Sequence, residues 1–356
     1  MTPLKAIPLV AAVAALAVPA AFAKQPHPFA GDRQVTVMSR NLFLGTDLKP
    51  ILQAPSLPAL FAAVGAGWTQ VQANDFPARA EALADEIADS EPDLVGLQEA
   101  MVFRTDVPPD GSASPAETVA YDFVDLLVDA LADRGLDYDA VSVYSGTDAE
   151  LPAGLPPTKD VRLTDHVVVL ARADQKTSDL KLSNPLSGAY VTRLTVSTVA
   201  GPVTLPRGWA SVDVKIRGTS FRFVTTHLEA FAAPIRNAQA GELVTGPAAT
   251  DLPVVLVGDM NSGPGTDGTA YGIIESAGFA DAWVDGDGLT CCHAVDLHDP
   301  NPTLTKRVDL VMTKGGFKTV VADVVGEETA DRTAGGLWPS DHAGVVTTLR
   351  LPDHEE

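Results

Sequence analysis

An aspartate and an asparagine follow a short apolar run, and this pattern can hold a metal ion or a reactive water molecule. The run Pro253-Val254-Val255-Leu256-Val257-Gly258 is typical of a buried strand, and Asp259 and Asn261 come directly after it. In open α/β sheets ligands bind outside the carboxyl ends of strands, because loops diverge there while the strands stay rigid. The alternative is a local role, in which Asp259 and Asn261 make turn hydrogen bonds before Gly263-Pro264-Gly265.

The same arrangement recurs along the chain, with polar, proton-transferring or oxygen-donor side chains at or beside the ends of expected apolar strands. These residues are Asn41, Glu99, His227, Asp259, Asn261, Asp309, Asp341 and His342. Taken singly, each has a simpler explanation: an aspartate or asparagine at a strand end can be a turn residue, and a histidine there can be structural, with its hydrogen bonds satisfied. Because several separate strands carry such groups at ends that could face one side, the set as a whole predicts a reaction centre.

Strands and helices that would position these residues are intermixed throughout the chain. We expect strands at 34–42, 94–97, 140–144, 167–171, 220–227, 253–258, 308–312, 320–325 and 343–351. We expect helices at 57–71, 77–88, 116–132, 235–244 and 271–277, and a loop near the site at 107–115. No internal repeat or linker divides the sequence, so it predicts an α/β or α+β class with one large core.

The first 23 residues have the features of a secretory signal peptide. Lys5 precedes an apolar run from Ala6 to Ala20, and Ala21-Phe22-Ala23 is a small-residue cleavage pattern. The run is too short to span a bilayer comfortably. We therefore expect a secreted or periplasmic protein without stable membrane insertion, with a short segment at 24–33 and one domain at 34–356.

The net charge of −21 argues at first sight against a polyanionic partner, but the acidity is regional. Between Asp75 and Glu150, thirteen aspartates and six glutamates stand against three arginines, which is typical of solvated helix faces. Between Lys159 and Arg222, four lysines and six arginines outnumber five aspartates. A modest basic surface in that second region is therefore compatible with a phosphodiester substrate.

The two cysteines are neighbours, Cys291 and Cys292, and cannot link distant parts of the fold. A vicinal disulfide and two buried thiols are both compatible with this spacing. Metal binding by the pair with His293 is a weaker third interpretation, because too few soft ligands stand nearby to complete a closed site.

A set of motifs in a particular order resembles the endonuclease/exonuclease/phosphatase superfamily. The motifs are Asn41, Leu97-Gln98-Glu99, Thr226-His227-Leu228, Gly258-Asp259-Met260-Asn261, Arg307-Val308-Asp309 and Ser340-Asp341-His342, and they span nearly the whole chain after the leader. The resemblance implies a four-layered sandwich, with two mixed β-sheets packed face to face and helices outside. It also implies hydrolysis of a phosphoester with a divalent metal ion.

The resemblance also implies a role for each residue. Glu99 resembles the main metal carboxylate, with Asn41 beside it, and Asp341 belongs to the same metal-binding set. Asp259 is similar to the group that orients or deprotonates the attacking water, and Asn261 to its positioning partner. In the terminal pair, His342 matches the histidine that contacts phosphoryl oxygens and Asp309 the carboxylate that holds it. His227 matches a second histidine, which assists the leaving group.

Elementary electrostatics independently requires a cation at such a centre. A phosphodiester is an anion, and approach to four carboxylates would cost several kcal/mol without an intervening positive ion. Oxygen ligands with few thiols favour Mg²⁺, with Mn²⁺ or Ca²⁺ as alternatives. Histidines near neutral pKa can transfer protons, and a carboxylate behind one fixes its tautomer.

Some members of the superfamily support the histidine matched by His227 with an acidic residue on a middle strand. Asp165 is the candidate for that role here, with Asp160 nearby and the spacing undecided. The region 150–208 matches the family pattern least clearly, and the resemblance implies that substrate contacts come largely from variable loops of this kind.

The leading hypothesis is a secreted metal-dependent phosphodiesterase acting on nucleic acid, without an obligate protein partner. A phospholipid head-group hydrolase similar to sphingomyelinases is the first alternative, although no hairpin carries paired exposed aromatics. A phosphomonoesterase is another enzymatic option. A non-catalytic binding module on the same fold is the remaining one, and the completeness of Glu99, Asp259 and His342 argues against it.

Overall fold

The computed structural model describes residues 33–111, 113–174 and 180–352. The expected signal peptide at 1–23, and the segment that follows it up to residue 32, lie outside the described residues. No helix within the described ranges is long and apolar enough to cross a membrane.

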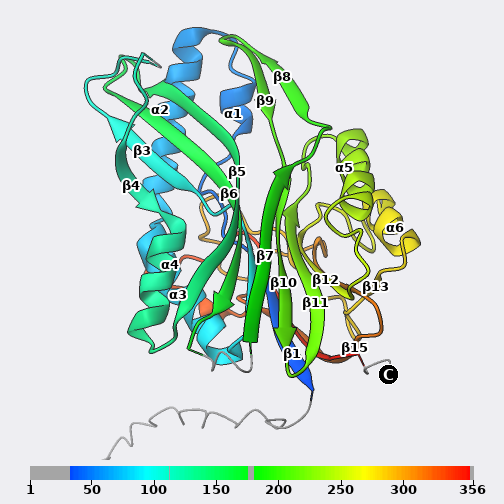
Figure 1. The fold of residues 1–356 in the computed structure, drawn as a ribbon. Coiled ribbons are helices and arrows are strands. Elements are labelled where there is room, and N and C mark those ends of the chain that lie inside the picture. Colours follow the sequence, from blue (N-terminus) through cyan, green and yellow to red (C-terminus); the bar gives the residue numbers. More distant parts are fainter. Residues whose placement is uncertain (1–32, 112, 175–179, 353–356) are drawn as a thin grey trace, which may run out of the picture. The chain divides into compact units, whose positions relative to one another are not determined.

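Two mixed β-sheets form the middle of the fold (Figure 1). In the first sheet the strand order is β15-β16-β1-β2-β6-β3-β4, with β5 paired to β6. Its strands are β1 (Gln34–Asn41), β2 (Leu94–Gln98), β3 (Val102–Asp106), β4 (Thr118–Asp122), β5 (Tyr138–Ala153), β6 (Lys159–Arg172), β15 (Lys318–Val325) and β16 (Gly344–Arg350). Strands β1 and β2 run parallel, whereas β1 and β16 are antiparallel.

The second sheet has the order β13-β14-β12-β11-β10-β7. Its strands are β7 (Leu180–Ala189), β10 (Gly208–Ile216), β11 (Thr219–His227), β12 (Val254–Asp259), β13 (Ala280–Asp281) and β14 (Asp309–Lys314). Strands β11 and β12 are parallel, and β12 and β14 are antiparallel. A separate two-stranded hairpin consists of β8 (Leu194–Thr198) and β9 (Gly201–Leu205).

The two sheets pack face to face through one apolar cluster. Alternate residues of β1, Val35 and Val37, are buried in the same cluster as Val255 and Val257 of β12, as period-two alternation requires. The sheets approach closely at Gly96 of β2, where an added Cβ would lie 2.4 Å from the Val257 side chain. A larger residue at this position would push the sheets apart next to the predicted site.

Helices cover the outer face of each sheet (Figure 1). They are α1 (Lys49–Leu52), α2 (Leu57–Ala73), α3 (Phe76–Ser90), α4 (Phe123–Asp133), α5 (Ala233–Thr245) and α6 (Thr269–Ser276), with a 3₁₀ turn at Thr329–Asp331. One cluster joins α2, α3 and α4 to the first sheet, including Phe76 stacked on Phe123. Another joins α5 and α6 to the second sheet. This order of layers confirms the expected four-layered sandwich.

The helix expected at 116–132 is partly wrong. Residues 118–122 form β4, an edge strand antiparallel to β3, and α4 begins only at Phe123. Asp122 decides the boundary, because its Oδ1 accepts hydrogen bonds from the backbone N–H groups of Val124 and Asp125 and so caps the helix. The expected strand at 140–144 is likewise only part of β5, which forms a long hairpin with β6.

Candidate active site

Strand register brings three predicted residues of the second sheet side by side. His227 at the end of β11 pairs with Asp259 at the end of β12, and Asp259 pairs with Asp309 at the start of β14. In the first sheet Asn41 pairs with Gln98, which places Glu99 one residue beyond the end of β2. Asp341 and His342 precede β16, which is paired to β1.

Hydrogen bonds between side chains join the two sheets at this end. Gln98 donates through Nε2 to the Thr225 hydroxyl over 3.0 Å. Asn41 donates through Nδ2 to Oδ2 of Asp259 over 3.2 Å, and its Oδ1 accepts from the Phe43 N–H. Asn41 is buried, and both ends of its side-chain amide are engaged in these contacts.

The Asp259 carboxylate lies at the centre of the cluster and is almost fully buried. Its Oδ2 lies 3.4 Å from Nε2 of His227 and 4.0 Å from Nε2 of His342, while Oδ1 accepts from the Asn261 N–H over 2.8 Å. Burial, and then the neighbouring charge of Asp309, raise the pKa of Asp259 to about 7. A carboxylate with such a pKa can accept a proton near neutral pH.

His342 and Asp309 form a buried pair. Nδ1 of His342 lies 2.7 Å from Oδ2 of Asp309, and the Asp309 N–H is bound by the Thr290 hydroxyl. Burial alone would lower the pKa of His342, but the surrounding carboxylates, Asp309 first and Asp341 next, together raise it well above its ordinary value. The geometry therefore favours a protonated His342.

His227 has the opposite electrostatic environment. Its Nδ1 lies 3.0 Å from Nη1 of Arg207, a residue between β9 and β10. Because a guanidinium only donates, Nδ1 accepts, and Nε2 carries the hydrogen that faces Asp259. Burial, followed by the charge of Arg207, lowers the pKa of His227 well below its ordinary value. The two histidines that face Asp259 thus differ in protonation.

Arg207 separates His227 from the acidic residues on this side of the site. The same Nη1 lies 3.6 Å from Oδ2 of Asp165, and Nε lies 3.9 Å from Oε2 of the buried Glu229. Asp165 therefore approaches His227 through the guanidinium of Arg207. Asp160, the other candidate for this supporting role, instead accepts hydrogen bonds from the backbone of Asp110 and Gly111.

Glu99 and Asp341 line a cleft of about 360 Å³ together with Arg207, Phe231 and Cys292. Burial raises the pKa of Glu99, and burial raises that of Asp341 to about 7, with Glu99 contributing further. Oδ1 of Asp341 and Oδ1 of Asp309 are buried without hydrogen-bond partners. Carboxylates in this state fit a divalent cation, because they supply free oxygen ligands and uncompensated negative charge.

Asn261 follows β12 in a left-handed conformation, with φ of 47°, which an asparagine tolerates better than most residues. Its Nδ2 donates to the Leu228 carbonyl over 3.0 Å. The side chain thereby joins the loop after β12 to the loop after β11. All eight predicted residues are placed at this one end of the sheets, and the particular role of each stays a prediction.

Three arginines near the site were not predicted from the sequence. Besides Arg207, the buried Arg79 of α3 donates to the carbonyls of Leu42, Phe43, Asn74 and Pro339, which belong to the loops around the site. Arg40 donates to the His342 carbonyl and to Glu86. Alternation along β1 could have indicated Arg40, but no local pattern indicates the other two.

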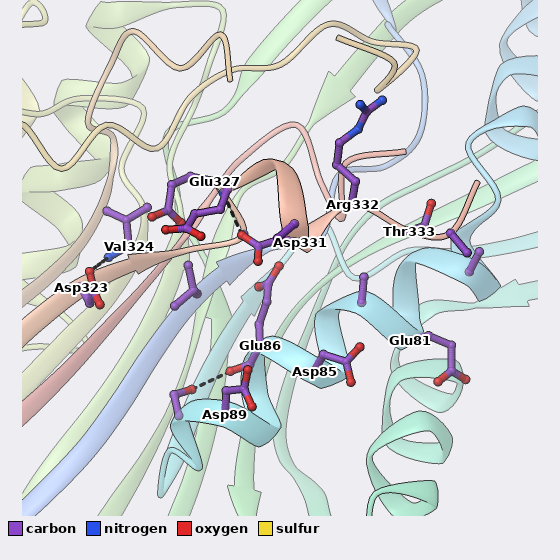
Figure 2. A pocket seen from close by; sticks show the side chains of 18 of the residues that line it. Glu81, Asp85, Glu86, Asp89, Asp323, Val324, Glu327, Asp331, Arg332 and Thr333 are labelled. Carbon is purple, nitrogen blue, oxygen red and sulfur yellow. Dashed lines mark hydrogen bonds between the residues drawn. The ribbon is translucent and has the colours of Figure 1, made fainter. Parts of the chain in front are cut away.

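A larger cavity, of about 870 Å³, lies between α3 and the segment 323–335 (Figure 2). Acidic side chains line it, and Figure 2 shows Glu86 extending from α3 toward Asp331. Burial raises the pKa of Glu86 to about 7 despite its ion pair with Arg40. None of the eight predicted residues lines this cavity, whereas Glu99 and Asp341 line the smaller cleft, which is therefore the candidate active site.

Cys291 and Cys292 form a vicinal disulfide at the edge of the cleft. Sγ of Cys292 lies 3.9 Å from Nε2 of His342. The two sulfur atoms are adjacent, which is compatible with the disulfide among the interpretations left open by the sequence.

The fold and the cluster define a class of protein: a four-layered sandwich in which acidic and histidine side chains meet at one end of both sheets. The sequence profile of the Endonuclease/Exonuclease/phosphatase family matches residues 64–342. The chain therefore belongs to this family of phosphoester hydrolases, as its motifs predicted. Comparison with curated proteins found no match.

Solved structures with the same fold include several bacterial and animal proteins. An endonuclease/exonuclease/phosphatase family protein from Bacteroides thetaiotaomicron is 18% identical, with a TM-score of 0.57 over 91% of this chain and 99% of that one. Humanized D. rerio TDP2 is 15% identical, with a TM-score of 0.54 over 89% and 99%. A mannosyl-6-phosphatase from Bacteroides thetaiotaomicron is 18% identical, with a TM-score of 0.53 over 88% and 99%.

Proposed function

We propose that the chain is a divalent-metal-dependent phosphodiesterase that hydrolyses nucleic acid by in-line attack of water. One observation carries this proposal: Oδ2 of Asp259 is approached by the Nε2 atoms of His227 and His342, whose pKa values are shifted in opposite directions. A base beside one neutral and one cationic histidine can serve both the attacking and the leaving oxygen of a phosphoester. Such an arrangement goes beyond what a binding module needs.

In this proposal Asp259 orients the attacking water and takes its proton, which suits a pKa near 7. Asn261 fixes the Asp259 carboxylate, because its backbone N–H donates to Oδ1. Asn41 donates to the other oxygen and so holds the carboxylate from the opposite sheet. A fixed base reduces the reorganisation that the reaction requires.

His342, protonated and held by Asp309, donates to the phosphoryl oxygens as negative charge develops on them. His227 has Nε2–H directed to the same region and assists the leaving group, while Arg207 fixes its tautomer. We assign the positioning of His342 to Asp309 and that of His227 to Arg207.

Glu99 and Asp341 would hold the divalent ion, with Mg²⁺ favoured and Mn²⁺ or Ca²⁺ as alternatives. Their shared cleft, raised pKa values and the free Oδ1 of Asp341 support this assignment. The ion, when bound, polarises the phosphoryl oxygen and stabilises charge on the leaving oxygen. Asn41, which the resemblance placed beside the metal, has both ends of its amide engaged and is proposed instead to act through Asp259.

Nucleic acid is proposed as the substrate because of two residues in the cleft and one of the solved structures. Phe231 is 46% exposed at the cleft, where an aromatic ring can stack on a base, and Arg207 offers positive charge there. One structure with this fold is D. rerio TDP2 complexed with single-strand DNA product, with a TM-score of 0.50 at 16% identity. Arg162, Arg172 and Arg222 of the basic region are engaged in ion pairs away from the cleft, whereas the ion pairs of Arg207 with Asp165 and Glu229 lie beside it. We propose that the protein is exported, as its first 23 residues suggest.

The test is hydrolysis of plasmid DNA, RNA, sphingomyelin, mannose 6-phosphate and bis-p-nitrophenyl phosphate by the purified protein, with Mg²⁺ and then with EDTA. We expect Mg²⁺-dependent cleavage of DNA or RNA and none in EDTA. Cleavage of sphingomyelin or mannose 6-phosphate alone would replace the nucleic-acid proposal by a lipid head-group hydrolase or a phosphomonoesterase. Full activity in EDTA would remove the metal from the mechanism.

A further inference from the structure

A second group of carboxylates converges where β3, β5 and β6 meet. Asp110 follows β3, Glu150 lies on β5 and Asp160 lies on β6, and one ligand atom from each lies within 4.8 Å of the others. β6 lies between β3 and β5 in the sheet, and its Asp160 pairs with Asp106 on one side and Pro152 on the other. None of these three residues lines the candidate active site.

The carboxylate of Asp160 is fully buried and only half used. Its Oδ2 accepts hydrogen bonds from the N–H groups of Asp110 and Gly111, over 2.6 and 2.9 Å. Its Oδ1 has no hydrogen-bond partner. Glu150 repeats the pattern, because Oε2 accepts from the Ala116 N–H over 2.8 Å and Oε1 is buried without a partner.

Within the described ranges, no arginine or lysine side chain forms an ion pair with Asp110, Glu150 or Asp160. The neighbouring Arg162 is paired with Asp148 through two hydrogen bonds. Lys159, next to Asp160 in sequence, extends instead over the ring of Trp68, 6.0 Å from its centroid. Asp160 is a fully buried carboxylate without an ion-pair partner, which is unfavourable, so a cation at this position would offset that penalty.

We propose that Asp110, Glu150 and Asp160 bind a calcium ion. The donor set consists of oxygens from a loop and a hairpin, with no thiol or imidazole, which selects a hard cation. Ca²⁺ accepts irregular arrangements of six to eight oxygens, whereas Mg²⁺ requires a near-ideal octahedron that such a set does not impose. The unpaired oxygens of Asp160 and Glu150 are the expected ligands. The exposed carboxylate of Asp110, which accepts hydrogen bonds from Ser114, would complete the anionic side.

Bound calcium would fasten the loop after β3 to the β5–β6 hairpin. The same hairpin provides Leu163 and Asp165 to the wall of the active-site cleft. We expect calcium binding to raise the stability of the folded protein. A better-ordered cleft wall would be a secondary consequence. This calcium site is separate from the metal site proposed at Glu99 and Asp341. The experiment must therefore distinguish binding at the two sites.

The experiment uses Glu99→Gln as the background, so that calcium binding in the cleft is reduced. Titration with Ca²⁺ alone by isothermal calorimetry should then show one site, with a Kd on the order of 10⁻⁴ M as in extracellular calcium modules. Adding Asp160→Asn or Glu150→Gln should weaken binding at least tenfold. Asp139→Asn, an exposed change on β5 outside the three carboxylates, is the matched control and should leave the Kd unchanged.

Thermal unfolding supplies the second measurement. In Ca²⁺ at about 100 times the Kd the Tm of the Glu99→Gln protein should rise, and the rise should vanish in the double variant with Asp160→Asn. In EDTA that double variant should be at least as stable as its parent, because it removes a buried charge. An unchanged Kd and an unchanged Tm response in both Asp160→Asn and Glu150→Gln would overturn the proposal, as would the absence of calcium binding in the background protein. If one variant fails to fold, the other decides.

Discussion

Arg207 donates a hydrogen bond to Nδ1 of His227 over 3.0 Å, which makes Nε2 of that ring the N–H that faces Asp259. A positive group, rather than a carboxylate, therefore holds this histidine. The charge of Arg207 also lowers the pKa of His227, after burial, and keeps the ring neutral at acidic pH. This contact distinguishes His227 from His342, whose Nδ1 faces the carboxylate of Asp309.

Replacing Arg207 by alanine should therefore change the pH profile. Without the guanidinium the pKa of His227 rises toward its ordinary value, so a larger fraction of the ring is protonated at pH 6. We expect kcat to fall by about tenfold or more, and to fall further at pH 8, where the neutral ring can switch tautomer, than at pH 6, where the protonated ring keeps its Nε2–H. Arg193→Ala, which removes a nearby arginine that donates to the Tyr190 carbonyl, is the control. Equal loss at both pH values would contradict the proposed role.

Replacing Asp309 by asparagine should move the basic side of the profile. The carboxylate raises the pKa of His342, so its loss lets the ring deprotonate at a lower pH. The basic limb of kcat/KM should shift downward, and the maximum rate should fall by about 10²-fold or more. The measurement is the pH dependence of hydrolysis between pH 5 and 10, with the histidine signals followed by NMR. An unmoved basic limb would show that Asp309 does not act through His342.

Asp259→Asn should separate catalysis from stability. The amide keeps an acceptor for the Asn261 N–H but cannot take a proton, so turnover should be lost. Removing the charge of Asp259, which is buried beside Asp309 and has a raised pKa, offsets the contact of the new amide N–H group with the donors of Asn41 and His227, so the metal-free protein should keep about the same stability at pH 8. Hydrolysis at the wild-type rate by the folded variant would remove Asp259 from the mechanism.

Magnesium should stabilise the protein more at pH 8 than at pH 6. Asp259 and Asp341 have pKa values of about 7 in the folded chain, against 3.8 for an ordinary aspartate. As pH rises from about 4 through 7 the unfolded chain ionises these groups freely and the folded chain does so at a cost, so metal-free stability falls. The cation compensates the charges once they are ionised. A thermal shift by Mg²⁺ that is equal at both pH values, or unchanged in Asp341→Asn, would contradict this prediction.

Arg79→Met should destabilise the fold by about 3 to 5 kcal/mol, because four carbonyls of the loops around the site lose their donor. Urea unfolding measures the change. Arg134→Ala is the comparison, since its partners Glu81 and Asp85 are largely exposed and the loss should be at most about 1 kcal/mol. Similar losses in the two variants would show that Arg79 is not the structural support described here.

The family resemblance predicted the order of layers, and the pattern of strand ends predicted where the eight polar residues lie. Each of those residues follows or precedes an apolar run, so the periodicity that predicts the strand also locates the polar group. Asp259 and His227 are examples, because both stand at the last position of a buried strand. The motifs supplied the family, which the match over 64–342 confirms.

Strand periodicity could not predict Arg207 and Arg79, because only tertiary contacts give these residues their roles. Arg207 is twenty residues from His227 and reaches it only because β10 pairs with β11. Arg79 stands on a helix whose other polar residues are mostly exposed, and its burial depends on loops more than 250 residues away in sequence, such as that of Pro339. The error at 118–122 has a similar origin, since pairing with β3 overrides a weak helical pattern.

The pairing of His227 with Asp259, and of Asp259 with Asp309, makes the reaction centre a product of strand alignment. Side chains along a strand alternate between its two faces, so a slip of β12 by one position would turn Asp259 away from both neighbours. A protein with a misaligned sheet would then be inactive, not merely less active. Recovery of hydrolysis during refolding would accordingly report when β11, β12 and β14 have reached their native alignment.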